Sequence, residues 1–350
     1  MAKDALHRRG IGPGHHEYST LPTGGQATIT VTVAAPSGAM VTATYAATVR
    51  PAVTATVTEL TVPTAGASPQ SIALGGDNGM WFTEFLGHKV GRVATTVGQA
   101  GTIAEYAVSG AAYGIASGMG AVEANTLWFT EAGTGVGSGT AIGSMGLDGT
   151  IFNETSTPTY DEPWAIAADS SGNMWFTEAE GSAIGEVTGL NIKEFPLPMQ
   201  NTGTYGITIV NSVIWFTEES GALGSLVPST MTITEFTGLS ANGGITLGPD
   251  NNIWFLETKK IGSIDPATKT IKELPIWGQP NGAASGLVIG TDHNLWYTTD
   301  DSVSRITTTG AVTEFPTPTQ PSGTEGIAVG ADGTIWFTEN AANKIGRISP

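Results

Sequence analysis

Short runs of alternating apolar and polar residues recur along the chain with a period of about 40 residues. The last copy, EGIAVGADGTIWFTENAANKIGRISP, contains an apolar run at 326–330, an Asp-Gly turn at 332–333, and further runs at 334–339 and 344–348. Earlier copies add a fourth run, such as AVTEF at 311–315. Short β-rich runs separated by Gly, Asn and Asp turns predict antiparallel hairpins. Four strands per repeat are typical of one β-propeller blade.

Each copy carries a motif close to Trp-Phe-Thr-Glu, which reads WFLE at 254–257 and WYTT at 296–299. Its tryptophans are Trp81, Trp128, Trp175, Trp215, Trp254, Trp296 and Trp336. The repeats predict an all-β protein, a seven-bladed β-propeller with four-stranded blades. The seventh copy has no fourth run, whereas TVTELTVPTAG at 56–66 matches the fourth runs of other copies. We expect strand 57–63 to close the ring, because closure leaves no exposed sheet edge. The propeller would span 56–350.

The first 55 residues precede the repeats and predict an N-terminal β arm. Polar residues dominate at the start, and alternating Thr and Val positions at 28–33 and 41–49 then flank an APSGA turn. This pattern predicts a hairpin, which is only marginally stable by itself. Residues 1–55 are therefore expected to form an extended tail and a hairpin. The hairpin either packs on its own ring or adds strands to a protein partner.

The two faces of each blade should both be buried. Neighbouring residues of a strand point to opposite faces, so Trp and Thr of the motif share one face while Phe and Glu share the other. The recurring glutamates are Glu84, Glu131, Glu178, Glu218, Glu257 and Glu339. A catalytic group is not needed six times around a ring. We expect these carboxylates to accept hydrogen bonds from backbone N–H groups, with one or two left open as ligand or cation sites.

Charge and composition narrow the possible partners. The formal net charge is −17, which disfavours nucleic acid, and the chain has no cysteine. No apolar run approaches the ~20 residues of a membrane span, and no secretory signal pattern stands at the start. The Thr-, Gly- and Ala-rich composition favours a virion, an extracellular protein or a cell-surface structure.

The repeat GIAVGADGTIWFTENAANKIGRI, followed in other copies by TEFPTP, resembles the virginiamycin B lyase (streptogramin B lyase) family over roughly residues 57–350. The resemblance implies a seven-bladed propeller. It also implies an enzyme that opens the lactone of a cyclic depsipeptide by elimination, with a magnesium ion holding the substrate. The family's chemistry uses histidines in a Pro-His-x-Ile element at the start of inner strands.

None of the matching positions carries histidine in this chain. They are occupied by Gln70, Tyr113, Trp164, Tyr205, Gly243, Ser285 and Glu325. Three of the five histidines, His7, His15 and His16, lie in the N-terminal tail, whereas His88 and His293 fall in hairpin turns. A general base must lie within hydrogen-bond reach of the proton it removes. The sequence therefore favours a protein that is not an enzyme.

Two hypotheses follow. The first is a binding or assembly module, such as a phage-tail component, that binds glycan or peptide at the propeller mouth. Its expected ligand-binding residues are Gln70, Tyr113, Trp164, Tyr205, Ser285 and Glu325. The alternative is a magnesium-dependent lyase in which Glu162 and Glu325 replace the missing acid and base. The binding module needs no cofactor, the lyase would need magnesium, and the residues that would bind a metal stay unknown.

Overall fold

The computed structural model describes residues 25–34, 40–49, 55–95, 101–118, 125–133, 140–158, 162–198, 203–276 and 286–349, the first two ranges by their backbone alone. The chain divides into two compact units, Met1–Thr54 and Ala55–Pro350. In the first unit, β1 (Gly25–Ala34) pairs antiparallel with β2 (Met40–Val49). The predicted hairpin is confirmed. Whether it packs on its ring or on a partner stays a prediction, and the tail of 1–24 lies outside the described residues.

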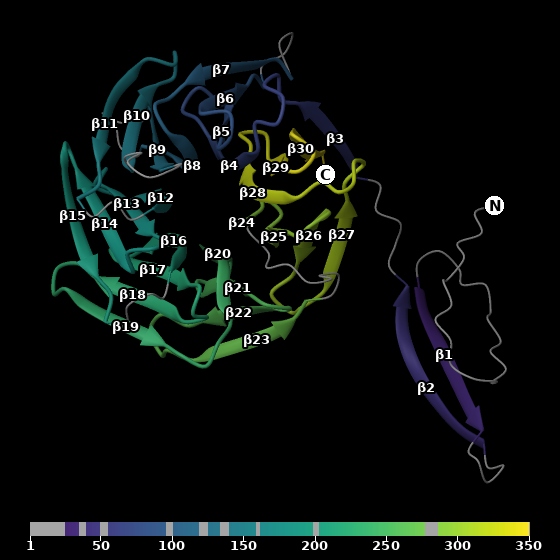
Figure 1. The fold of residues 1–350 in the computed structure, drawn as a ribbon. Helices are drawn as coiled ribbons and strands as arrows, with labels where there is room; N and C mark the ends of the chain where they lie inside the picture. The colour runs from purple at the N-terminus through teal and green to yellow at the C-terminus, as the bar shows by residue number, and fades with distance from the viewer. Residues whose placement is uncertain are drawn as a thin grey trace. The chain divides into compact units, whose positions relative to one another are not determined.

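The second unit is a ring of seven four-stranded antiparallel sheets, as predicted (Figure 1). From the axis outwards, blade 1 comprises β4 (Pro69–Leu74), β5 (Met80–Glu84), β6 (Lys89–Val93) and β7 (Ile103–Ala107). Blade 2 comprises β8 (Ala111–Ser117), β9 (Thr126–Ala132), β10 (Ala141–Gly146) and β11 (Ile151–Ser156). Blade 3 comprises β12 (Pro163–Ala168), β13 (Met174–Glu178), β14 (Ala183–Thr188) and β15 (Asn191–Pro196). Blade 4 comprises β16 (Thr204–Val210), β17 (Val213–Glu218), β18 (Leu223–Val227) and β19 (Thr232–Phe236). Blade 5 comprises β20 (Ala241–Leu247), β21 (Ile253–Glu257), β22 (Lys260–Ile264) and β23 (Ile271–Pro275). Blade 6 comprises β24 (Leu287–Ile289), β25 (Leu295–Thr298), β26 (Ser302–Ile306) and β27 (Val312–Pro316).

The seventh blade joins the two ends of the ring. It comprises β28 (Thr324–Val329), β29 (Ile335–Glu339), β30 (Lys344–Ser349) and, as its outermost strand, β3 (Thr56–Thr61). Val57 pairs with Ile348, which confirms that an N-terminal strand closes the ring. The strand ends at Thr61, two residues earlier than predicted. Pro63 follows Val62 and has no N–H to donate to a ladder.

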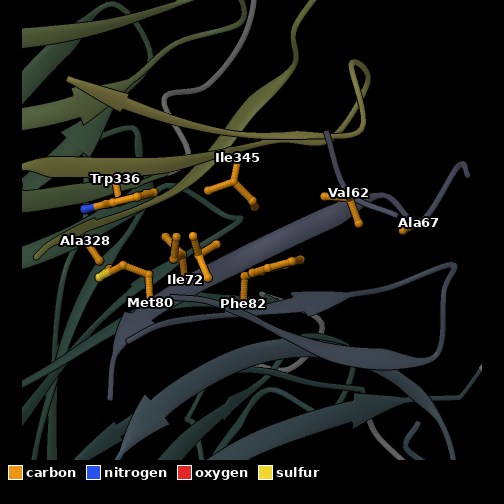
Figure 2. Close-up of a cluster of buried hydrophobic side chains, with 9 residues drawn as sticks. Val62, Ala67, Ile72, Met80, Phe82, Ala328, Trp336 and Ile345 are labelled. Carbon is orange, nitrogen blue, oxygen red and sulfur yellow. The ribbon is translucent and has the colours of Figure 1, made fainter. Parts of the chain in front are cut away.

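The core consists of layers between neighbouring blades. Figure 2 shows the layer between blades 7 and 1, where Trp336 and Ile345 face Ile72, Met80 and Phe82. All five side chains are at least nine-tenths buried. The tryptophan of one blade and the phenylalanine of the next thus lie in one buried layer, which confirms that both blade faces are buried.

The glycine at the centre of the third strand, Gly91 of β6 in blade 1, follows from this packing. A Cβ atom on Gly91 would lie 2.2 Å from Cζ of Phe82, well inside van der Waals contact. The phenylalanine ring therefore covers the middle of the third strand, and a larger residue there would push it out of the core.

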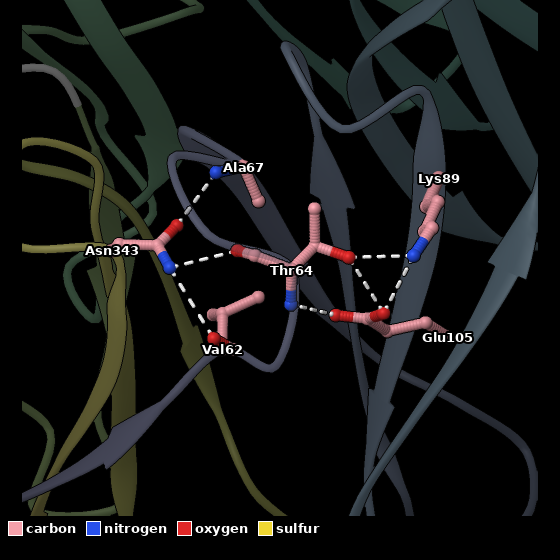
Figure 3. Close-up of polar contacts among 6 residues, drawn as sticks. All are labelled: Val62, Thr64, Ala67, Lys89, Glu105 and Asn343. Carbon is pink, nitrogen blue, oxygen red and sulfur yellow. Dashed lines mark hydrogen bonds and ion pairs between the residues drawn. The ribbon is translucent and has the colours of Figure 1, made fainter.

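Polar contacts hold the seam between blades 7 and 1 (Figure 3). The Asn343 side chain accepts a hydrogen bond from the Ala67 N–H at 2.8 Å and donates to the carbonyls of Val62 and Thr64. Thr64 in turn donates to Glu105, which pairs with Lys89 at 2.7 Å. Asn343 has φ of 57°, a left-handed conformation that asparagine tolerates better than most residues. One side chain thereby links the two ends of the ring.

Candidate functional site

A cavity of about 490 Å³ lies at the start of the innermost strands, around the ring axis. We call it the ring mouth and define it by the side chains of Gln70, Tyr113, Trp164, Tyr205, Glu219, Asn242 and Glu325. Each innermost strand contacts the next one around the ring. Residues far apart in the sequence therefore meet in one cavity.

A bulge at the start of each of six innermost strands presents these side chains, except Glu219, which follows the end of β17. In blade 3, Pro163 pairs with Glu178 and Ile166 pairs with Phe176, so two residues on β12 oppose one residue on β13. Such a bulge redirects a side chain out of the regular alternation. Trp164 occupies this bulge and lines the ring mouth.

The motif threonines fix the bulges to one another. Thr177 accepts a hydrogen bond from the Ala165 N–H of its own blade and donates to the Tyr205 carbonyl of the next, both at 2.9 Å. Six threonines make this pair of bonds, namely Thr83, Thr130, Thr177, Thr217, Thr298 and Thr338. Blade 5 has Leu256 instead. The backbone of the ring mouth is thus held by a relay of hydroxyls from blade to blade.

One side of the ring mouth is aromatic. The ring centroids of Tyr113 and Trp164 are 3.7 Å apart, and Trp164 meets Tyr205 edge to face at 5.6 Å. Burial raises the pKa of both tyrosines, and the Glu325 carboxylate raises both further. Both phenols therefore stay protonated near neutral pH. They can donate hydrogen bonds but are poor general acids.

Carboxylate and amide side chains form the rest of the ring mouth. Oε1 of Glu325 accepts a hydrogen bond from Nδ2 of Asn340 at 3.1 Å, and Glu219 and Asn242 contribute from blades 4 and 5. Oδ1 of Asn242 is buried and has no hydrogen-bond donor among the described residues. The described lining contains no Lys, Arg or His. The described lining of the ring mouth therefore combines aromatic faces with acidic side chains.

Most of the predicted site residues meet in this cavity. Gln70, Tyr113, Trp164, Tyr205 and Glu325 all line it. Ser285 lies outside the described residues, so its place is open.

Glu162 is not among the lining residues. Burial and the nearby Glu180 carboxylate raise its pKa. The structure therefore does not bring Glu162 and Glu325 together as a pair of catalytic groups in the cavity. Their assignment as acid and base stays a prediction.

Glu219 and Asn242 were not expected from the sequence. In blade 5, Ala241 pairs with Glu257 and Ile245 with Phe255, so the bulge has one residue more than in other blades. The family pattern pointed to Gly243, and its neighbour Asn242 supplies the side chain. Glu219 follows the fourth motif directly, and no other copy has a glutamate there.

The histidines and the motif glutamates lie elsewhere. His88 and His293 occupy turns with φ of 50° and 57°, and neither lines the ring mouth. Glu131 accepts a hydrogen bond from the Gly110 N–H, and Glu257 from the Ser240 N–H, as expected. No described group donates to either carboxyl oxygen of Glu339. None of the six motif glutamates is among the lining residues.

The family resemblance implies magnesium, which prefers oxygen ligands in octahedral geometry. No group of three or more His, Cys, Asp or Glu side chains that could hold a metal ion occurs in the described part of the chain. Glu219 and Glu325 are the acidic residues of the lining. The described residues thus do not form a magnesium site by themselves, and a magnesium requirement stays a prediction. No helix in the described ranges is long and apolar enough to cross a membrane.

The family model of the virginiamycin B lyase family matches residues 8–226 and 230–350. A virginiamycin B lyase of Nocardia farcinica is 28% identical over 187 residues, which are 53% of this chain and 66% of that relative. A streptogramin B lyase structure superposes with a TM-score of 0.74 at 27% identity, covering 84% of this chain and 97% of that one.

A second solved structure matches equally well. It is a catalytically inactive histidine-to-alanine variant of Staphylococcus aureus virginiamycin B lyase with quinupristin. Its TM-score is 0.74 at 28% identity, over 85% of this chain and 99% of that one. These relatives are described as enzymes. They give no support to a virion or phage-tail component.

Proposed function

Because the chain belongs to the virginiamycin B lyase family, we propose that its ring mouth binds a cyclic peptide lactone. The observation that carries the proposal is the cavity itself, whose lining comes from the same bulge position of successive blades. Its volume of about 490 Å³ lies in the range of pockets for drug-sized ligands. A relative with this fold is described with quinupristin, which supports a ligand of that class.

Opening of the lactone is the first candidate activity, and the relatives described as lyases favour it. An elimination needs a base at the proton it removes. Glu325 is the base that we propose, because it lines the cavity and Asn340 orients its carboxylate. Tyr113 and Tyr205 would donate hydrogen bonds to the ester as protonated phenols.

Binding without turnover is the second candidate. The relative with quinupristin is inactive after the loss of one histidine, and no histidine lines the described ring mouth of this chain. The chain would then keep the family's binding cavity as a peptide-binding or glycan-binding module. Attachment to a protein partner through residues 1–55 remains part of this candidate.

One experiment separates the two. The protein is incubated with quinupristin in magnesium and in chelator, and the products are analysed by chromatography and mass spectrometry. Elimination leaves the mass unchanged but shifts retention, whereas hydrolysis adds one water. Turnover that is lost in Glu325→Gln and kept in Glu180→Gln, at an exposed position outside the lining, supports the lyase. Calorimetric binding without turnover supports the second candidate, and the absence of binding overturns both.

A further inference from the structure

We propose that the ring mouth recognises a positively charged organic group, an ammonium, on its ligand. The inference rests on the proposed function in placing the ligand in this cavity, and it adds the charge that the ligand carries. Three features of the ring mouth support it: its charge, its aromatic faces and their place in one cavity.

The charge of the cavity has one sign. Glu219 and Glu325 line it, and no Lys, Arg or His stands among the described lining residues. Outside the ring mouth, basic side chains form ion pairs with other carboxylates, as Lys89 does with Glu105 and Arg92 does with Asp77. A concave site walled by one sign of charge concentrates ions of the opposite sign, and the net charge of −17 acts in the same direction.

The aromatic faces offer the second element. Tyr113, Trp164 and Tyr205 come from three consecutive blades and contact one another as a continuous cluster. Aromatic faces attract cations through the negative potential above the ring, and tryptophan does so most strongly. Trp164 stands between the two tyrosines and is only partly buried, so its indole is accessible from the cavity.

Carboxylates and aromatic rings line the same cavity, where they can act on one ligand group. The Glu325 carboxylate raises the pKa of both Tyr113 and Tyr205, and the Glu219 carboxylate also raises the pKa of Tyr205. The buried Oδ1 of Asn242 adds an acceptor without a described donor. A neutral apolar ligand would leave Oδ1 of Asn242 without a donor, which is costly. A cation with a polar hydrogen can donate to it and is attracted by the two carboxylates.

The groups are also held in place before a ligand arrives. Thr130 and Thr177 fix the carbonyls of Trp164 and Tyr205, and Thr298 fixes the carbonyl of Glu325. Prior ordering of a site lowers the cost of binding. The aromatic cluster and the carboxylate are therefore presented at a defined separation.

The test uses a matched pair of probes that differ in charge. Choline and its neutral carbon analogue 3,3-dimethyl-1-butanol have the same shape and the same hydroxyl group. Calorimetric titration of the full chain should show that choline binds about tenfold more tightly, and that added salt reduces the difference. Equal affinity for the two probes, or no binding of choline at about 100 mM, would overturn the inference.

Substitutions test whether the preference for choline comes from the ring mouth. We expect Trp164→Leu, which keeps apolar volume but removes the aromatic face, and Glu325→Gln, which keeps the shape, each to lower choline affinity several-fold. Glu180→Gln, at an exposed position outside the lining, is the matched control, and circular dichroism checks the fold of each variant. Unchanged choline affinity in both mouth variants contradicts the inference. Choline selectivity without quinupristin binding leaves the inference standing and overturns only the proposed function.

Discussion

At the scale of single residues, the motif threonine has the most specific role. Its hydroxyl accepts from a bulge N–H and donates to the carbonyl of the adjacent blade, so both hydrogen-bonding capacities are used. Valine has nearly the same shape but neither capacity. Replacement by valine therefore tests the hydroxyl with little change in packing.

We expect Thr130→Val to lower the free energy of unfolding by about 1–3 kcal/mol, because the Gly114 N–H and the Trp164 carbonyl lose their partner. Urea unfolding measures the change. Thr234→Val, at an exposed position of β19, is the matched control and should change stability far less. A similar small change in both variants would show that the relay adds little to stability.

The sequence predicted on which face the motif threonines lie, but not which groups they hydrogen-bond to. The motif spacing predicted that Trp and Thr share a buried face, and the core confirms it. The partner of the threonine hydroxyl lies on another blade, and a pattern within one repeat does not specify it. Gln70, Tyr113, Trp164, Tyr205 and Glu325 were found through the family's inner-strand position. Asn242 was missed because one extra bulge residue shifts the alignment by one.

At the scale of strands, blades 1 and 7 carry the same charged arrangement. In each of these blades the glutamate at the end of the second strand, Glu84 or Glu339, is fully buried. Near it, a glutamate of the outer strand forms an ion pair with a lysine of the third strand. The pairs are Lys89 with Glu105 and Lys344 with Glu59. Burial, followed by the neighbouring glutamate, raises the pKa of Glu84 and Glu339 to about 8.

These two carboxyls predict a stability that falls with rising pH. Their unfolded pKa is near 4.5, so between pH 4.5 and 8 the folded state binds more protons than the unfolded state. Their stabilising contribution is complete below pH 4.5 and is lost as pH rises through 8. Each pKa unit corresponds to about 1.4 kcal/mol, so the expected fall is several kcal/mol.

Urea unfolding at pH 5.5 and pH 8 measures this fall. The double variant Glu84→Gln with Glu339→Gln should show a much flatter profile and greater stability than the parent at pH 8, because an amide stays neutral. Glu180→Gln, at an exposed position, should keep the parent's slope. An unchanged slope in the double variant would assign the pH dependence to other groups.

At the scale of the whole molecule, the ring and its closure could be predicted because the repeat is regular and one strand was missing at the C-terminal end. The same regularity could not identify the ligand, since the blades share a scaffold and differ at the ring mouth. The fold follows from the residues that the seven repeats share. We expect specificity to depend on ring-mouth residues such as Trp164, Glu219 and Glu325, at which the repeats differ.

Closure predicts an abrupt effect of truncation. A chain that begins at residue 55 keeps β3, whereas one that begins at residue 62 loses the whole of it and exposes β30 as a bare edge. We expect the shorter chain to melt on the order of 10 °C lower and to aggregate, because Val57 and Leu60 no longer cover the cores beside blade 7. Scanning calorimetry compares both with the full chain. The chain from residue 55 is the control, and an equal loss there would mean that residues 1–54 themselves stabilise the ring.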